Sequence, residues 1–391
     1  MFFWNRLLDS KDKKYTLVGK KMKIVFITHY SDLYGANLSM LGLAEMFIEQ
    51  YDIDVYIICP QKGKVVDVAR KKGIHVKCIP YIYWQGQRFI TLKKLLRVIW
   101  NPICIELSCC YVKKISPDVI HSNSSVADLG VVISKRMKIP CVWHLREFGE
   151  EDYNLKYVVP SKKIGELYSS ANRIIAISEY LRASYKKKYP VLDISVVYNG
   201  VKNFSVKRKK HLGCNFCVIG RITEQKGQYQ VLKAVVELIK SKRDGFHLYI
   251  VGEGKDRYVN KLMEYVFSND LDEYVTFTGY VEDISDFLCG MDVGIMSSKC
   301  EAFGRVTVEY MYAEMQVIAT NYGGTKEIIG DNAMYYDFGD FICLADKMGK
   351  CMDNQYENRD ELRLMAEKKF NQRVCTKNIL NIYKEMGIRT N

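Results

Sequence analysis

The chain has 391 residues, 48% of them hydrophobic, so it is long enough to form two domains of ordinary size, each with its own core. Its net charge of +13 lies wholly in the first half: residues 1–200 contain 31 Lys and Arg against 18 Asp and Glu, whereas residues 201–391 contain 27 of each. This excess favours an anionic partner, and because no nucleic-acid-binding motif is present, we expect no nucleic acid and favour an anionic lipid surface.

The cysteines and the apolar segments indicate a cytoplasmic protein. The thirteen Cys form no C-x-x-C pair with zinc spacing, and several lie in apolar segments, so we expect reduced core thiols. The aromatic start turns polar too soon for a signal-peptide core, and no uninterrupted run of 18 apolar residues occurs, so no transmembrane helix is predicted. Phe2, Phe3 and Trp4, followed by a basic run at 11–21, either contact a membrane or belong to a disordered tail.

Strands and helices alternate through the first half. An apolar strand at 23–27 leads through Gly35 into a helix, and a second strand at 53–59 repeats the pattern. This alternation predicts a parallel, doubly wound α/β sheet. Asp52 and Asp54 have the spacing of a metal-binding D-x-D motif, but they stand at a strand start between apolar residues. We therefore interpret this spacing as coincidence and predict no metal.

Residues 81–112 combine aromatic and basic side chains. Leucine and isoleucine residues recur there at helical spacing, beside Lys93, Lys94 and Arg97. This composition is typical of a helix that lies in the interface of an anionic membrane. The alternative is a core-facing helix with a solvated basic face. The interleaved aromatic residues are Tyr81, Tyr83, Trp84, Phe89 and Trp100, with Arg88 among them.

Polar residues follow two further strands of the first half, at the positions where ligands bind in open α/β sheets. His121 ends one strand and His144 the next, and His144 is the stronger candidate for a functional residue. The alternative for each is a histidine of the core. The acidic residues 150–152 are interpreted as a solvated turn. A basic linker at 207–210 places the domain boundary near residue 205.

The stretch from Glu301 to Glu309 carries the chemistry. It follows an apolar strand at 293–296, and Gly304 opens a helix whose first N–H groups and positive dipole end bind anions. Glu301 and Glu309 repel phosphate but accept hydrogen bonds from hydroxyl groups. An anion site between two hydroxyl acceptors suits a sugar nucleotide, in which a diphosphate lies between the sugar and the ribose.

This stretch resembles the E-x7-E signature of the retaining glycosyltransferases of family 4, with Glu-Ala-Phe-Gly at 301–304 and the second carboxylate at Glu309. The resemblance spans about residues 22–385 and implies the GT-B fold, an α/β fold of two Rossmann-like domains with a cleft between them. It implies three segments: an N-terminal acceptor- and membrane-facing domain at 1–205, a donor domain at 206–370, and a helix at 371–391 that returns to the first domain.

The resemblance also implies roles for single residues. Arg221 and Lys226 neutralise the donor diphosphate, while Glu301 holds sugar hydroxyls. Glu309 holds the ribose, and His144 lies near the reacting sugar. The implied catalytic residues are Glu301, His144, Arg221 and Lys226. The implied donor-binding residues are Gly35, Ala36, Gly220, Arg221, Lys226, Gly252, Phe303, Gly304, Arg305, Thr307 and Glu309.

The sequence departs from the family at three places. Tyr34 stands where the family has the first glycine of a Gly-Gly-Ala loop, and Arg305 replaces a common apolar residue. Residues 314–316 replace a Gly-x-Pro helix stop, which bears on the local turn rather than on the chemistry.

We therefore expect a retaining, metal-independent hexosyltransferase that uses a UDP- or GDP-linked donor and no cofactor. Its acceptor is expected to be a lipid-linked glycan of bacterial surface polysaccharide or glycolipid assembly. The protein is placed in the cytoplasm, at the inner face of the membrane. Because no carboxylate is an obvious nucleophile, we favour front-face displacement in which the leaving phosphate acts as the base.

Two alternatives belong to other functional classes. A nucleotide-sugar epimerase or a phosphorylase shares this architecture, but the sequence shows neither convincingly placed epimerase carboxylates nor a pyridoxal-phosphate lysine signature. A non-catalytic partner subunit that binds membrane or sugar is the second alternative. Degeneration should have eroded Glu301, Arg221, Lys226 or Glu309, and all four are present.

Overall fold

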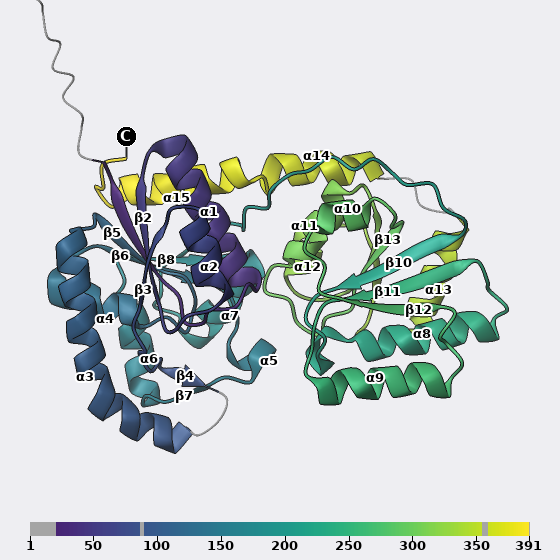
Figure 1. Cartoon of the computed structure of the whole chain (residues 1–391), viewed down its shortest axis with the longest axis horizontal. Helices are drawn as coiled ribbons and strands as arrows, with labels where there is room; N and C mark the ends of the chain where they lie inside the picture. The colour runs from purple at the N-terminus through teal and green to yellow at the C-terminus, as the bar shows by residue number, and fades with distance from the viewer. Residues whose placement is uncertain (1–20, 87–89, 354–358, 391) are drawn as a thin grey trace, which may run out of the picture.

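The computed structural model describes residues 21–86, 90–353 and 359–390. It contains two α/β domains side by side, each built on a parallel sheet, as the sequence predicted (Figure 1). The predicted membrane contacts of Phe2, Phe3 and Trp4 lie outside the described residues, as do Arg88 and Phe89.

The first domain is a seven-stranded parallel sheet with the strand order β3-β2-β1-β5-β6-β8-β9. Its central strands are buried on both faces, which is why they carry runs of apolar residues rather than an alternating pattern. The strands are β1 (Lys23–Ile27), β2 (Asp54–Cys59), β3 (His75–Cys78), β5 (Val119–Ser122), β6 (Cys141–Leu145), β8 (Arg173–Ala176) and β9 (Ile194–Val196). A short antiparallel ribbon joins β4 (Gln85–Gly86) to β7 (Lys156–Tyr157).

Helices cover both faces of this sheet. Successive residues of β1 point to opposite faces, so Ile24 and Phe26 share one apolar cluster with Phe47, whereas Val25 lies in the cluster that contains Trp143. The helices are α1 (Gly35–Tyr51), α2 (Lys64–Lys71), α3 (Ile90–Ile115), α4 (Leu129–Met137), α5 (Glu150–Tyr153), α6 (Ser161–Tyr168) and α7 (Glu179–Lys188).

The second domain is a six-stranded parallel sheet with the order β12-β11-β10-β13-β14-β15. The strands are β10 (Cys214–Ile219), β11 (Phe246–Val251), β12 (Val275–Gly279), β13 (Val293–Met296), β14 (Gln316–Thr320) and β15 (Met334–Tyr336). The helices are the 3₁₀ turn η1 (Glu224–Lys226), α8 (Gln228–Lys240), α9 (Asp256–Ser268), α10 (Ile284–Leu288), α11 (Arg305–Tyr312), α12 (Gly324–Ile329) and α13 (Phe341–Met352).

Both sheets reverse their strand order beside their first strand. Strand β1 lies between β2 and β5, and β10 lies between β11 and β13. Ligands bind outside the carboxyl ends of strands at such reversals. Strands β10 and β11 point toward the first domain (Figure 1), so the loops that follow them lie at the junction of the two domains.

The end of the chain returns to the first domain, as predicted. Helix α14 (Arg359–Lys369) runs along the second domain, and α15 (Gln372–Glu385) packs on α1 of the first (Figure 1). Tyr383 of α15 is fully buried there, with its hydroxyl 2.6 Å from Nδ1 of His121. The predicted boundaries at 205 and 370 fall between β9 and β10 and between α14 and α15.

The aromatic and basic residues before and within α3 do not all face outward, contrary to prediction. Tyr81 is 4% exposed and Trp84 is fully buried. The indole of Trp84 donates to the carbonyl of Ser125 inside the domain. Arg97 is ion-paired with the buried Asp128 and donates to the carbonyl of Ile82 at 2.6 Å. Arg97 is therefore a structural residue of the first domain rather than a surface charge.

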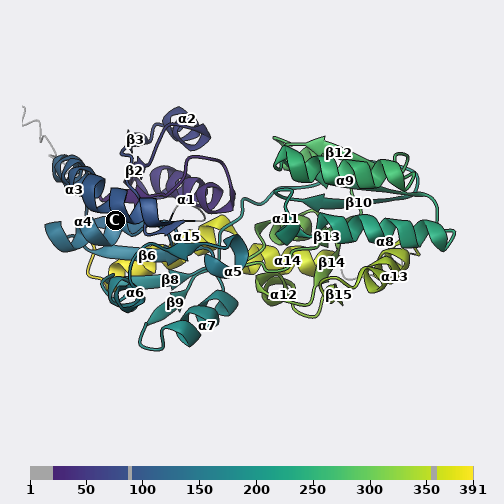
Figure 2. The ribbon, with the colours of Figure 1, turned by 90° about the horizontal axis from the view of Figure 1, so that it is seen from below.

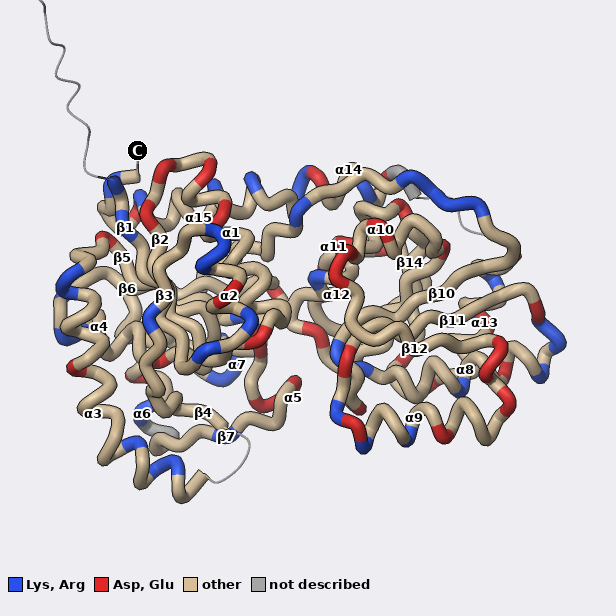
Figure 3. The backbone as a smooth tube through the Cα atoms, viewed as in Figure 1, with Lys and Arg blue, Asp and Glu red and all other residues tan. Residues whose placement is uncertain are grey.

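The outer side of α3 is apolar instead. Leu95, Val98 and Ile99 are 59%, 74% and 64% exposed. By length and composition α3 is long and apolar enough to cross a membrane, and 28% of its apolar stretch is buried. The sequence predicted no such helix, because charged residues interrupt the apolar run. Figure 3 shows basic residues near the first turns of α3, followed by a long uncharged stretch.

Replacement of Tyr383 tests the contribution of the returning helix to the first domain. Tyr383→Ala should lower the free energy of unfolding by about 3–5 kcal/mol, because a fully buried ring and a hydrogen bond are lost. All four Trp precede residue 205, so urea unfolding followed by Trp fluorescence reports on this domain. The control is Val374→Ala, on the same helix and 37% exposed. Equal stability of the two variants would show that α15 is not part of the folded core.

Candidate functional site

Residues 301–304, the central loop, lie where the two domains meet. The carbonyl of Ala302 accepts a hydrogen bond from Oγ of Ser178 in the first domain at 2.5 Å, and the carbonyl of Glu301 accepts one from the N–H of Gly324 at 2.7 Å. A Cβ on Gly324 would lie 2.6 Å from the carbonyl oxygen of Ala302. Glycine is required there because the turn after β14 packs directly on the central loop.

Gly304 starts α11 in a backbone conformation that other residues rarely adopt. Its φ is +90°, and a Cβ would lie 2.8 Å from Oγ1 of Thr307 and 2.9 Å from Oγ1 of Thr325. The Thr307 side chain is fully buried, and its hydroxyl has no hydrogen-bond partner among the described residues. The Phe303 ring packs against Tyr198, so this residue can offer a ligand only its backbone.

The structure brings Lys226 and Glu301 together. Nζ of Lys226 lies 2.6 Å from Oε2 of Glu301, and the two side chains are 29% and 19% exposed. Lys226 is the last residue of η1, and its backbone is fixed because the hydroxyl of Ser297, in the loop after β13, donates to the Lys226 carbonyl at 2.7 Å. The cation predicted for the diphosphate and the carboxylate predicted for the sugar thus share one place.

Arg305 and Glu309 form a second pair one turn further along α11. Nε of Arg305 lies 3.1 Å from Oε1 of Glu309, and the two side chains are 23% and 12% exposed. Burial raises the pKa of Glu309, while the charge of Arg305 acts in the opposite direction. Arg305, which stands where the resembled family commonly has an apolar residue, therefore has a partner on its own helix.

The glycines at the strand ends differ in role. A Cβ on Gly252 would lie 2.1 Å from the carbonyl oxygen of Gly220, so Gly252 is required by the packing of the β10 and β11 ends. A Cβ on Gly220 or on Gly35 would have no atom within 4 Å, so both positions border open space. Ala36, next to Gly35, accepts a hydrogen bond from the side chain of Asn123 through its carbonyl at 3.0 Å.

Arg221 lies on the opposite side of the junction from α1 and contacts the residue that precedes this helix. The central carbon of its guanidinium lies 3.8 Å from the centre of the Tyr34 ring, which stands just before α1. Arg221 is exposed, and Tyr34 is 39% exposed. Arg221, Gly35 and Ala36, predicted to bind the donor, therefore lie close together although they belong to different domains.

His144 lies deeper than the other predicted residues. It is 2% exposed, and its Nδ1 lies 3.0 Å from Nε2 of His121, which in turn contacts Tyr383. Burial lowers the pKa of both histidines well below the ordinary value, so both rings are neutral. Residues from α1, α15 and the loop at 198–200 line the small cavity beside His144. A role near the donor sugar remains a prediction.

Two charged residues after β6 escaped the sequence prediction. Glu147 is 6% exposed and accepts hydrogen bonds from the N–H and hydroxyl of Ser125 at 2.7 and 2.8 Å, and burial raises its pKa. Arg146 is 6% exposed and donates to the side chain of Asn123 at 2.6 Å, and burial lowers its pKa to about 10. Their position directly after a strand end is the signal in the sequence that would have identified them.

The prediction of a solvated acidic turn at 150–152 holds for Glu150 and Glu151, which are exposed, and is wrong for Asp152. The Asp152 carboxylate accepts hydrogen bonds from the N–H groups of Phe148 and Gly149 at 2.9 and 2.7 Å. Burial, and then the charge of Glu147, raise its pKa to about 7. Burial and then Asp152 raise the pKa of Cys300, beside the central loop, to about 12. Both views place α5 at the edge facing the second domain (Figures 1 and 2).

No group of three or more His, Cys, Asp or Glu side chains within residues 21–86, 90–353 and 359–390 is arranged to hold a metal ion. Asp52 ends α1 in a left-handed conformation with φ +50° and pairs with Lys21, while Asp54 begins β2.

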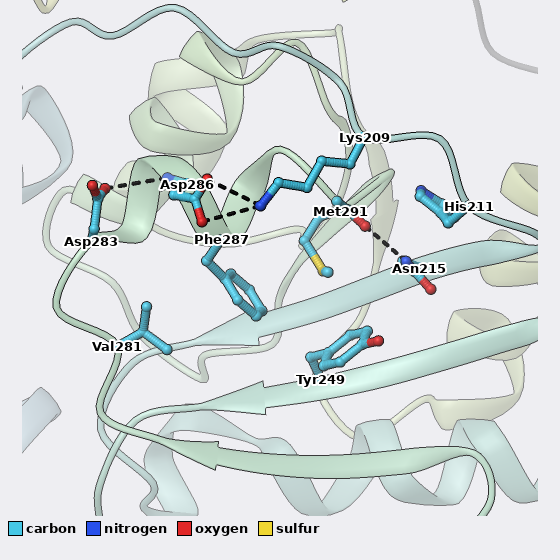
Figure 4. A pocket seen from close by; sticks show the side chains of 10 residues that line it. Lys209, His211, Asn215, Tyr249, Val281, Asp283, Asp286, Phe287 and Met291 are labelled. Carbon is cyan, nitrogen blue, oxygen red and sulfur yellow. Dashed lines mark hydrogen bonds and ion pairs between the residues drawn. The ribbon is translucent and has the colours of Figure 1, made fainter.

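A cavity of about 450 Å³ lies in the second domain, lined by none of the predicted site residues (Figure 4). Lys209 bonds both carboxylate oxygens of Asp286 at 3.0 and 3.1 Å, and the side chain of Asn215 donates to the carbonyl of Gly290. Because none of the predicted site residues lines this cavity, we do not assign the active site to it.

Both domains match known families. Residues 34–202 match the family described as Glycosyltransferase Family 4, and residues 213–354 match the family described as Glycosyl transferases group 1.

Two named relatives align along most of their length. The chain is 26% identical over 366 residues to the capsular polysaccharide biosynthesis glycosyltransferase CapM of Staphylococcus aureus, covering 86% of this chain and 91% of CapM. It is 18% identical over 389 residues to the O-antigen biosynthesis glycosyltransferase WclY of Escherichia coli, covering 93% of this chain and 99% of WclY.

Solved structures share the fold. HepE of Anabaena, solved in complex with UDP, superposes with a TM-score of 0.76 at 18% identity, over 93% of this chain and 100% of HepE. Sucrose-phosphate synthase of Thermosynechococcus elongatus superposes with a TM-score of 0.74 at 15% identity, over 94% of this chain and 99% of the synthase. These likenesses confirm the predicted GT-B fold.

Proposed function

The chain is a glycosyltransferase built from a Glycosyltransferase Family 4 domain and a Glycosyl transferases group 1 domain, and on this premise we propose that it moves a sugar from a nucleotide-sugar donor to a glycan acceptor. The acceptor belongs to bacterial surface polysaccharide or glycolipid assembly. The relatives CapM and WclY, named for capsular polysaccharide and O-antigen biosynthesis, support this context.

The observation that carries the donor assignment is the pair Lys226–Glu301 at the domain junction. Partly exposed ion pairs contribute only about 0–1 kcal/mol, so a ligand can replace them at little cost. A donor diphosphate takes over the Lys226 ammonium in a charge-assisted contact. Glu301 is then free to accept hydrogen bonds from the hydroxyl groups of the sugar. Both predicted roles are compatible with the observed pair.

The proposed mechanism rests on fixed charges. The nucleoside diphosphate gains negative charge as the bond to the sugar breaks, and Arg221 and Lys226 stabilise that charge without reorganising. The N–H groups at the start of α11 add a positive dipole end. Glu309 holds the ribose. The acceptor hydroxyl attacks from the face that the diphosphate leaves, and a departing phosphate oxygen takes its proton, so the anomeric configuration is retained and no metal or cofactor is needed.

We further propose that the first domain binds the inner face of the membrane through α3, where it meets a lipid-linked acceptor. The exposed Leu95, Val98 and Ile99 supply an apolar strip, and Lys93 and Lys94 stand at its beginning. A helix with this distribution lies in the plane of the interface. The sequence predicted binding through basic and aromatic residues together, whereas we now expect apolar contact to contribute more than charge to the free energy of membrane binding.

A non-catalytic sugar-binding subunit is less well supported. Such a subunit has no need for paired charges around a helix start. Lys226–Glu301 and Arg305–Glu309 are both formed. The assay of transfer described below separates the two.

Nucleotide binding tests the donor assignment. UDP or GDP, and the corresponding nucleotide sugars, should raise the melting temperature, because a ligand at a hundredfold its Kd stabilises the folded state by about 2.7 kcal/mol. The nucleosides alone should have little effect, since they lack the diphosphate.

EDTA should leave transfer largely unchanged. Complete loss of transfer activity with EDTA, restored by Mn²⁺ or Mg²⁺, would contradict the metal-free mechanism and favour metal binding by Asp52 and Asp54.

Lys226→Ala and Glu301→Gln should each lower turnover by about 10²–10³, because a fixed group acting on developing charge is lost. The measurement is kcat with the donor that the binding screen selects. The control is the ion pair Glu237–Lys240 at 2.9 Å on α8, changed to Gln and Ala, which should leave kcat unaltered. Near-parental kcat in either site variant would remove that residue from the catalytic machinery.

Vesicle co-sedimentation tests the membrane proposal. Leu95→Ser, Val98→Ser and Ile99→Ser together should lower binding to anionic vesicles about a hundredfold, since each partly exposed side chain contributes about 1 kcal/mol. Lys93→Glu with Lys94→Glu should lower it about thirtyfold at low salt, at about 1 kcal/mol for each cation. Arg97 is left unchanged because it pairs with Asp128.

Matched exposed residues serve as the control for this test. Met263 and Phe267, on α9 of the second domain, are 48% and 76% exposed, and their change to Ser should leave sedimentation unaltered. If the α3 variants sediment like the parent, α3 is not the membrane-binding surface.

A further inference from the structure

Tyr34 supports Arg221 across the domain junction, and we propose that it is a positioning residue that holds the guanidinium ready for the donor diphosphate. The proposal rests on the proposed function, in which Arg221 binds that diphosphate. The guanidinium carbon lies 3.8 Å from the centre of the Tyr34 ring. At this distance the cation stacks on the negative face of the ring.

The Tyr34 ring is held by a well-anchored loop. Asn37 is fully buried, and its side-chain amide donates to the carbonyls of Tyr30 and Asp32 at 3.0 and 2.9 Å. Its side-chain oxygen accepts a hydrogen bond from the hydroxyl of Thr28 at 2.6 Å. The backbone of the segment between β1 and α1, which presents the Tyr34 ring, is therefore tied to the interior of the first domain.

Stacking leaves the hydrogen-bonding edge of Arg221 available. The guanidinium N–H groups lie in the plane of the group, so a ring against its face occupies none of them. Lys226 and Arg305, by contrast, are engaged by carboxylates at 2.6 and 3.1 Å. Tyr34 thus limits the rotamers of Arg221 without competing with phosphate, and less side-chain entropy is lost when a diphosphate binds.

The contact also joins the two domains. Tyr34 belongs to the first domain and Arg221 to the second, so the guanidinium is supported only while the domains are closed on each other. A reciprocal contact lies nearby, where Nζ of Lys64 in the first domain is 5.4 Å from the Tyr280 ring of the second. Tyr34, which stands where the resembled family has a glycine, therefore links the arrangement of the two domains to the position of a donor-binding cation.

A double-mutant cycle on UDP binding tests the proposal, with GDP used instead if it gives the larger thermal shift. Tyr34→Ala should raise the Kd of the nucleotide about three- to thirtyfold, the range expected for loss of a cation–π contact. Tyr34→Phe keeps the ring face and should stay within about twofold of the parent. Tyr34→Ala should add no loss when Arg221 is already Ala. In kinetics, Tyr34→Ala should raise KM for the donor more than it lowers kcat.

The controls separate this proposal from the proposed function. Tyr280→Ala removes the Lys64–Tyr280 contact between the domains and should have a smaller effect on Kd than Tyr34→Ala. If Arg221→Ala binds UDP like the parent, the diphosphate role of Arg221 fails, and the proposal falls with it. If Arg221→Ala weakens binding but Tyr34→Ala does not, or if Tyr34→Ala costs as much without Arg221, only the positioning role of Tyr34 is overturned.

Discussion

The proposed site depends on the central loop, residues 301–304, whose carbonyl groups accept hydrogen bonds from both domains. Ser178 of the first domain donates to Ala302, and Gly324 of the second donates to Glu301. With the carbonyls of Glu301 and Ala302 engaged, the loop presents the Glu301 side chain and the N–H groups at the start of α11. Three glycines make this possible, because a Cβ on Gly304, Gly323 or Gly324 would lie within 2.9 Å of neighbouring atoms.

The cations of the site each have a provisional partner. Lys226 lies against Glu301, Arg305 against Glu309, and Arg221 against the Tyr34 ring. Without these partners, cations gathered at one site would repel one another. Partners of modest strength keep them in place yet yield to a ligand, since partly exposed pairs are worth little in water. The proposed donor thus enters a site whose charges are already ordered and nearly balanced.

Sequence predicted what depends on local pattern and missed what depends on contacts between distant segments. The parallel sheets followed from the alternation of strands and helices, and the role of Gly304 followed from its place between a strand and a helix. Asp152 looked like a solvated charge because nothing in its neighbours shows that N–H groups of Phe148 and Gly149 fold over it. Arg97 looked like a surface cation because its partner Asp128 stands 31 residues away.

Arg97 also bears on how α3 meets a membrane. A helix of this length and composition can cross a bilayer, but crossing would take the helix away from Asp128 and from the carbonyl of Ile82. Asp128 is fully buried, so the loss of Arg97 would leave its carboxylate with hydrogen bonds from Tyr81 and Trp84 but without the charge of Arg97, which costs several kcal/mol. Arg97 itself would enter hydrocarbon at a further cost of about 2.5–3.5 kcal/mol. The buried ion pair therefore opposes insertion and keeps α3 on the first domain, where its exposed apolar strip can rest on the surface of a membrane without leaving the fold.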